Sequence, residues 1–240
     1  RTFSYTALPR EALGALADYR TLAEKFANAE KPLFRTRAER FYWLEYLAKE
    51  DVLYVRYSLC VDQGDIEQFW QELFRVADAK RPAKFVLDIR GNPGGDTKNN
   101  VSLLQEIRQR PWLNTRGRLF TITDRRTGSA AISLASHIER QTRAILVGEM
   151  PCDRANTTSD PTFFTLPHSD ITILLPNLYS LHSHSHDKRI GISPEWPVIA
   201  TLAGDGYLDD PAMSLILNYN PDTERETPRA ARLPSDVAGT

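Results

Sequence analysis

The sequence predicts an α/β protein built on a mostly parallel sheet. Between residues 65 and 149, short apolar runs alternate with longer stretches whose apolar side chains recur at helical spacing. Such alternation is typical of parallel strands covered by helices. In addition, polar turns containing glycine follow two of the apolar runs directly, at 90–96 and 124–129. Loops at the ends of rigid strands commonly carry function, so these junctions are where we look for chemistry.

The first half of the chain contains two predicted helices and three predicted strands. Residues 10–29 form an amphipathic helix, with Leu13, Leu16, Tyr19, Leu22 and Phe26 on one face. Aromatic and β-branched residues predict paired strands at 40–48 and 52–60, around the turn "KED". A helix at 65–79, with Asp65 as N-cap, leads into an apolar strand at 84–89.

The second half continues the alternation and then changes character. We expect helices at 101–110, 129–140 and 209–219, and strands at 118–123 and 143–149. Beyond Pro161 the pattern predicts only short strand-like pieces, at 163–166, 171–175 and 178–181. We therefore divide the chain into an N-terminal helical segment (1–35), a core domain (36–218) and a polar C-terminal tail (219–240).

Composition excludes some classes of function. The chain has 240 residues, 41% of them hydrophobic, which is enough for a substantial core. A net charge of -1 argues against nucleic-acid binding, which usually needs a basic surface. No apolar run approaches the roughly 20 residues that span a bilayer. The two cysteines, Cys60 and Cys152, define no disulfide framework and either pair or remain free.

The turns "DIRGNPGGD" and "TDRRTGSAAISLA" carry the candidate chemistry. The second places Ser129 at the start of a helix, where free amides and the helix dipole favour negative charge. The amides of Gly94, Gly95 and Ala130 would form an oxyanion hole for an attacked carbonyl. The structural alternatives are an N-capping serine and an ordinary glycine turn. The glycines of a G-x-S-x-G nucleophile elbow are absent.

Taken together, "KFVLDIRGNPGGD", "TGSAA" and "RAILVGE" resemble the tail-specific or C-terminal processing serine peptidases. The stretches "FYWLEYL", "LYVRYSLC", "SPEWPV" and "YLDDPAMSLIL" are similar to the branch without an obvious PDZ domain, which includes tricorn protease and interphotoreceptor retinoid-binding protein. The resemblance implies the Clp protease and crotonase-like spiral of β-β-α units. It also implies Ser129 as nucleophile, with amides of the Gly94–Gly95 turn and of Ala130 holding the oxyanion.

The loop after "VGE" departs from this family's pattern. The family's general base is a lysine on that loop, and counting along the chain brings its position to Arg154. Arginine stays protonated and cannot accept a proton from serine, but it can bind the carboxylate of a peptide C-terminus. The tricorn-like branch instead takes a histidine from upstream of the nucleophile, whereas the first histidine here is His137.

Other residues are weaker candidates for the missing base. Lys98 follows the glycine turn, although a solvated surface lysine is the commoner role. Glu195, in "SPEWPV", occupies a place where relatives carry an acid that orients the base. In "LHSHSHD", the alternating His182, His184 and His186 would share one face of a strand and offer a base or, with Asp187, zinc ligands. We expect no metal and no other cofactor.

Three functions remain open. The first is an active serine peptidase that cuts peptides or unfolded protein chains through an acyl-enzyme. The second is an inactive relative that binds a peptide or an apolar ligand in the former cleft, as the loss of the lysine favours. The third is a crotonase-like acyl enzyme, for which no adenine-nucleotide signature is visible. The resemblance favours an exported or periplasmic location, while the sequence leaves the oligomeric state open.

Overall fold

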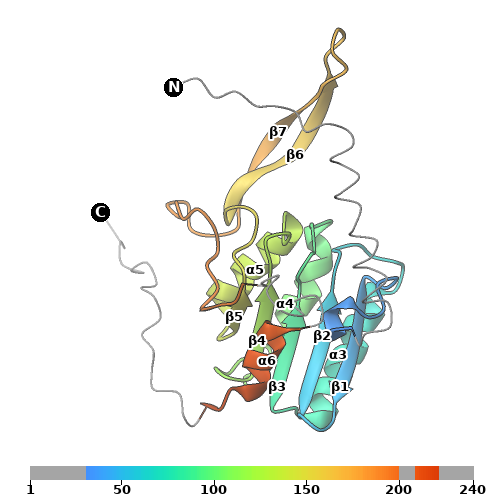
Figure 1. Ribbon diagram of the computed structural model, residues 1–240, viewed down its shortest axis with the longest axis vertical. Helices are drawn as coiled ribbons and strands as arrows, with labels where there is room; N and C mark the ends of the chain where they lie inside the picture. Colours follow the sequence, from blue (N-terminus) through green and yellow to red (C-terminus); the bar gives the residue numbers. More distant parts are fainter. Residues whose placement is uncertain (1–30, 200–208, 222–240) are drawn as a thin grey trace, which may run out of the picture.

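Six strands form the central sheet of the computed structural model, which describes residues 31–199 and 209–221 (Figure 1). Their order is β1-β2-β3-β4-β5-β8. Only β1 and β2 pair antiparallel; all later neighbours pair parallel. The strands are β1 (Tyr42–Leu47), β2 (Val52–Tyr57), β3 (Lys84–Asp88), β4 (Leu119–Thr123), β5 (Ile145–Gly148) and β8 (Trp196–Pro197). The predicted fold class is thus confirmed.

Helices cover both faces of this sheet. One face packs against α3 (Ile66–Lys80), α4 (Val101–Arg108) and α5 (Ala130–Gln141), and the other against α6 (Pro211–Asn218) (Figure 1). Two short 3-10 helices, η2 (Leu33–Arg35) and η3 (Thr97–Asn100), complete the layers. Within β3, Phe85 and Leu87 join the three-helix cluster while Val86 joins the α6 cluster. Burial on both faces explains why this strand is a continuous apolar run.

The parallel pairing brings the two candidate turns together. Asp88 of β3 is paired with Ile122 of β4, so both strands end at the same edge of the sheet. The glycine turn leaves β3 there, and the segment leading to Ser129 leaves β4 beside it. The segments that follow these two turns form α4 and α5, which pack on the same face of the sheet as α3.

The region after Pro161 differs from the sequence prediction. Instead of three short pieces, two strands of 10 residues each, β6 (Asn156–Thr165) and β7 (Thr172–Leu181), form a long antiparallel hairpin. Asp160 has a positive φ of 51°, and the Asn177 side-chain amide donates to its carbonyl at 2.7 Å. This cross-strand contact supports the ladder where Asp160 departs from regular strand geometry. The hairpin therefore continues through Asp160 and Pro161, where the sequence pattern predicts an interruption.

The cap of α3 also differs from the prediction. Asp65 occupies the N-cap position, but its side chain makes no capping hydrogen bond and instead accepts one from the Tyr42 hydroxyl. Asp62 takes the capping role, because its Oδ1 accepts the Ile66 amide at 3.1 Å. The predicted helix at 10–29 and residues 222–240 of the tail lie outside the described residues, so the domain boundaries remain predictions.

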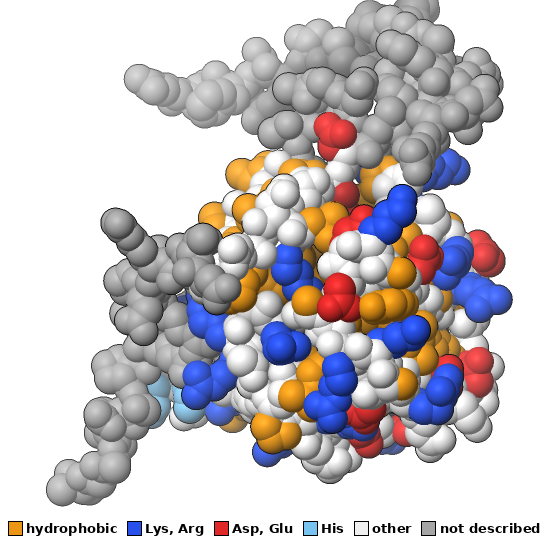
Figure 2. Space-filling view, turned by 90° about the horizontal axis from the view of Figure 1, so that it is seen from below, with side chains coloured by type: hydrophobic (Ala, Val, Ile, Leu, Met, Phe, Trp, Pro, Cys, Tyr) orange, Lys and Arg blue, Asp and Glu red, His pale blue; other side chains and the backbone are white. Residues whose placement is uncertain are grey.

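The surface carries charges of both signs. Seen from below in the orientation of Figure 1, basic and acidic side chains are interspersed with apolar ones, without a field of a single sign (Figure 2). Within the described ranges, no helix combines the length and apolarity that crossing a membrane requires.

Candidate active site

Ser129 lies at the junction between the turn after β4 and the first residue of α5. Its backbone has φ 47° and ψ -121°, a combination that is strained for any residue other than glycine. The side chain is exposed and makes no capping hydrogen bond to α5. Its geometry therefore does not match the common structural role of a serine at a helix start, which is to cap it.

Gly94 packs directly against this serine. A Cβ added to Gly94 would lie 2.5 Å from the Cβ of Ser129 and 2.9 Å from the Ala130 amide nitrogen. The next residue, Gly95, is equally confined, since a Cβ there would lie 2.2 Å from the Cys60 carbonyl oxygen. Both glycines also have positive φ angles, 114° and 134°. The two glycines are therefore required by close approach of the backbone to its neighbours as well as by the turn.

The amides of the two turns are not equivalent. Gly94 donates its amide to the Asn92 Oδ1 at 2.9 Å, so this group is already used. The part of the chain that the structure describes gives no acceptor to the amides of Gly95 and Ala130. Ala130 is the first residue of α5, where a backbone N–H has no partner within the helix. Of the three predicted donors, Gly95 and Ala130 thus have amides that remain available, and each directly follows one of the two residues in close contact, Gly94 and Ser129.

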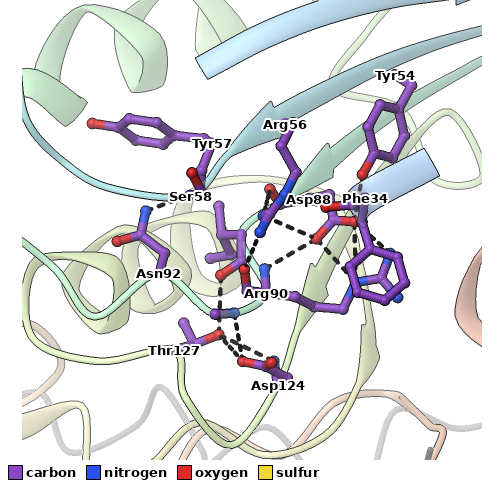
Figure 3. Close-up of polar contacts among 12 residues, drawn as sticks. Phe34, Tyr54, Arg56, Tyr57, Ser58, Asp88, Arg90, Asn92, Asp124 and Thr127 are labelled. Atoms are coloured by element: carbon purple, nitrogen blue, oxygen red, sulfur yellow. Dashed lines mark hydrogen bonds and ion pairs between the residues drawn. The ribbon is translucent and has the colours of Figure 1, made fainter. Parts of the chain in front are cut away.

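Asn92, which the sequence predicts only as part of the polar turn at 90–96, holds the glycine turn in place. It is fully buried, and its Nδ2 donates to the Tyr57 carbonyl at 3.0 Å (Figure 3). The backbone carbonyl of Asn92 accepts the Gly128 amide at 2.8 Å, which links the two turns one residue before Ser129. No sequence pattern distinguishes this asparagine from an ordinary turn asparagine, because its partners lie on other strands.

A second link joins the turns on their outer side. Asp124 accepts the Gly91 amide at 2.7 Å, and the Thr127 hydroxyl donates to the Ile89 carbonyl at 3.1 Å (Figure 3). Together with the Asn92 contacts, these bonds fix the segment before Ser129 to the segment before Gly94. The serine and the glycine amides therefore form one rigid unit.

A buried ionic network supports the end of β3. Asp88 is fully buried and pairs with Arg90 and with Arg56, while the Tyr54 hydroxyl donates to it at 2.6 Å (Figure 3). Burial alone would raise the Asp88 pKa, but the two guanidinium groups outweigh it and hold this pKa below its usual value. Arg90 also binds Asp210 at 2.8 Å, which attaches the start of α6 to the strand end that precedes the glycine turn.

An open pocket of about 330 Å³ lies at this edge of the sheet, on the side of α6. Phe34, Arg90, Asp124 and Glu149 contribute to its lining, and Ser129 does not. The pocket therefore adjoins the ionic network and is separate from the serine.

The altered loop after β5 lies beside the serine turn. The Cys152 amide donates to the Thr127 carbonyl at 3.1 Å, and its Sγ lies 3.3 Å from a Cβ built on Gly128. Cys60 and Cys152 are both free thiols. Burial, followed by the charge of Asp153, raises the pKa of the Cys152 thiol, which keeps it protonated. Arg154 is exposed at the end of this loop.

The other candidates for a base are not assembled around Ser129. Lys98 is exposed in η3, and its ammonium makes no contact with Ser129 in the part of the chain that the structure describes. Glu195 forms an ion pair with Arg116, which precedes β4, whereas Ser129 follows the opposite end of that strand. The Glu195 carboxylate therefore binds Arg116 and does not orient a catalytic base.

The histidines form no constellation at the serine. His182, His184 and His186 follow the end of β7 in an irregular loop, so the strand geometry considered for them is wrong. Asp187 is held by Arg189 and by Ser183, and these hydrogen bonds lower its pKa. His137 directs Nδ1 to the Ser133 carbonyl at 2.7 Å. Across the described ranges, no group of three or more histidine, cysteine or acidic side chains could hold a metal ion.

Comparison with known proteins agrees with this architecture. No family model matches the chain, and no curated protein matches it. A solved structure assigned as a peptidase, from Parabacteroides merdae, superposes with a TM-score of 0.51 at 15% identity, over 85% of this chain and 71% of that one. The fold is therefore that of peptidase structures, as the resemblance in the sequence predicts.

Two further structures are similar over a smaller share of their own length. An S41 protease structure from Bacteroides fragilis gives a TM-score of 0.49 at 13% identity, over 73% of this chain and 56% of that one. A photosystem II D1 C-terminal processing protease gives 0.44 at 17% identity, over 62% and 42%. The chain thus spans about half the length of these two relatives.

Proposed function

We propose that the protein is a serine peptidase-like hydrolase that cleaves peptide bonds through an acyl-enzyme on Ser129. The observation that carries this proposal is the strained, exposed and non-capping Ser129, held against Gly94 beside two unused amides. Strained backbone persists where the surroundings enforce it, and it is commonest at functional sites. A serine that only began a helix would need none of these features.

The proposed reaction uses the groups that the two turns bring together. The Ser129 Oγ attacks the peptide carbonyl carbon, and its proton passes to a base from outside the groups described at the site, since none of the candidate bases is assembled around Ser129. The carbonyl oxygen becomes an oxyanion, which the amides of Gly95 and Ala130 stabilise by hydrogen bonds. The C–N bond then breaks, the amine leaves with a proton, and water hydrolyses the Ser129 ester. Loss of one such amide donor typically reduces the rate about 10²- to 10³-fold.

A second candidate function rests on Arg154. The guanidinium stands where the resemblance places a lysine base, and it is exposed on the loop that lies against the serine turn. An arginine there is suited to bidentate binding of a carboxylate. This favours an inactive relative that holds a peptide by its C-terminus beside the serine turn.

A fluorophosphonate probe tests the first proposal. We expect it to label the wild-type chain and to leave Ser129→Ala unlabelled, because only an activated serine reacts. Ser185→Ala is the matched control, since Ser185 is another exposed serine that lies in the loop after β7. Labelling that persists in Ser129→Ala would contradict the assignment of the nucleophile.

A peptide-binding measurement separates the two candidates. Binding without labelling or turnover, lost on C-terminal amidation of the peptide and in Arg154→Met, would support the inactive binding protein. Turnover of a quenched fluorescent peptide by the wild type and none by Ser129→Ala would support the peptidase.

A further inference from the structure

The β6–β7 hairpin projects away from the sheet and its helices (Figure 1). Its strands carry eight large apolar side chains that are each at least 38% exposed, which is unusual for a surface of this size. They are Phe163, Phe164, Ile173, Leu174, Leu175, Leu178, Tyr179 and Leu181. A two-stranded hairpin alone is marginally stable in water, and packing on another element is what normally stabilises it.

The register divides these side chains between two faces. Residues directly opposite in an antiparallel pair share a face, and successive residues alternate. The pairs Phe164↔Ile173 and Thr162↔Leu175 lie on one face, and Phe163↔Leu174 lies on the other. We call the first the Phe164 face; continued along β7, it carries five of the eight apolar side chains: Phe164, Ile173, Leu175, Tyr179 and Leu181.

The edges of the hairpin are less suited to pairing than its faces. Pro161 lies directly opposite Pro176, and neither has an N–H to donate. Opposed prolines are compatible with a non-hydrogen-bonded pair, in which the backbone nitrogens point away from the partner strand. The outer edge of each strand therefore lacks an N–H donor near its centre. Prolines on edge strands commonly prevent the addition of another strand. A partner is therefore expected to pack on a face.

Charge indicates which partner this is. From residue 155 to residue 187 the chain contains no lysine and no arginine, so the hairpin lacks the permanently positive side chains that attract an anionic lipid surface. Asp160 is the single residue of the two strands that is charged at neutral pH, and in the alternation along β6 its position falls on the Phe164 face. Two copies of a face with one carboxylate each can meet across a two-fold axis that passes near Phe164, away from Asp160, which keeps the two carboxylates apart.

We propose that the Phe164 face of the hairpin is the contact between two copies of this chain. The two hairpins pack face to face about a two-fold axis, each covering the apolar side chains of the other. The contact is independent of the chemistry proposed for Ser129.

Sedimentation equilibrium of the wild-type chain, Phe164→Asp and Phe163→Asp tests this proposal. We expect the wild type at twice the chain mass of 27.2 kDa. Phe164→Asp should weaken the dimer at least about 100-fold, because a desolvated aromatic ring is replaced by an unpaired charge. Phe163→Asp is the matched control on the opposite face, and it should remain dimeric. Circular dichroism checks that both variants fold.

Three outcomes would overturn the proposal. A monomeric wild type, with the hairpin amides protected from hydrogen exchange only when residues 1–30 are present, would assign the face to that N-terminal segment. A monomer that binds phosphatidylglycerol vesicles through the hairpin would assign it to a membrane. Equal weakening by both substitutions, in folded variants, would exclude a contact specific to the Phe164 face.

Discussion

Gly94 leaves no room for a side chain beside Ser129, since a Cβ on the glycine would lie 2.5 Å from the Cβ of the serine. The contact joins the turn after β3 to the turn after β4 and sets the position of the Ser129 hydroxyl. The opening of α5 and the glycine turn therefore behave as one structural unit.

Gly94→Ala should cost more stability than its conformation alone explains. Gly64 is the matched control, because its φ is also positive, 99°, and nothing lies within 4 Å of an added Cβ. We expect about 1 kcal/mol for Gly64→Ala and a further 1–3 kcal/mol for Gly94→Ala from overpacking. Urea denaturation measures both. Equal losses in the two variants would contradict the tight contact, and Gly94→Ala should also lose labelling of Ser129.

Substitution of Ser129 should not destabilise the fold. Its backbone strain is of order 1–3 kcal/mol, so Ser129→Gly should raise the free energy of unfolding by about 1 kcal/mol after the entropy cost of glycine. Ser129→Ala keeps the strain and should change stability by less than about 0.5 kcal/mol. Thermal denaturation of the three proteins provides the measurement. A loss of 1 kcal/mol or more in both variants would mean that the serine caps α5 after all.

Asp88→Asn should impair folding before any other property. The substitution leaves the buried Arg56 without a carboxylate and Arg90 with Asp210 alone, and breaking a buried ion pair in this way typically costs about 3–5 kcal/mol. Glu72→Gln, which breaks an exposed pair with Arg75, should leave stability almost unchanged. A stable but inactive Asp88→Asn protein would instead place this residue in the reaction.

The same carboxyl predicts an acid-sensitive stability. Its folded-state pKa is depressed by the two arginines, so its contribution is present above the unfolded pKa of about 4. That contribution is lost as the pH falls from about 4 towards the lower folded pKa. Urea denaturation at a series of pH values should show the decline in the wild type and a shallower one in Asp88→Asn. Parallel curves would refute the assignment.

Arg154→Lys should increase the reactivity of Ser129. A lysine at this position can be deprotonated and accept the serine proton, whereas arginine cannot. We expect faster fluorophosphonate labelling than in the wild type, rising with pH as the lysine loses its proton. Arg154→Met is the matched control for the lost guanidinium. Equal rates in the lysine and methionine variants would show that this side chain does not reach Ser129.

The alternation of apolar runs and helical periodicity was enough to predict five strands of the sheet, its covering helices and the two candidate turns, whereas the short strand β8 was not predicted. These signals are local, because a strand buried on both faces needs a continuous apolar run such as Phe85–Ile89. The hairpin was misjudged for a local reason too. Pro161 and Asp160 interrupt the strand pattern, while the cross-strand contact of Asn177 that supports the ladder there depends on residues farther along the chain.

Only the tertiary structure determined the contacts between segments that are distant in sequence. The strain at Ser129, the use of the Gly94 amide by Asn92, and the availability of the Gly95 and Ala130 amides depend on how two strand ends meet. No local pattern predicts the contact of Asn92 with Tyr57 or of Asp210 with Arg90, because these partners lie on other elements. Sequence periodicity records which side chains are buried, whereas hydrogen-bond partners are determined by the packing of the whole sheet.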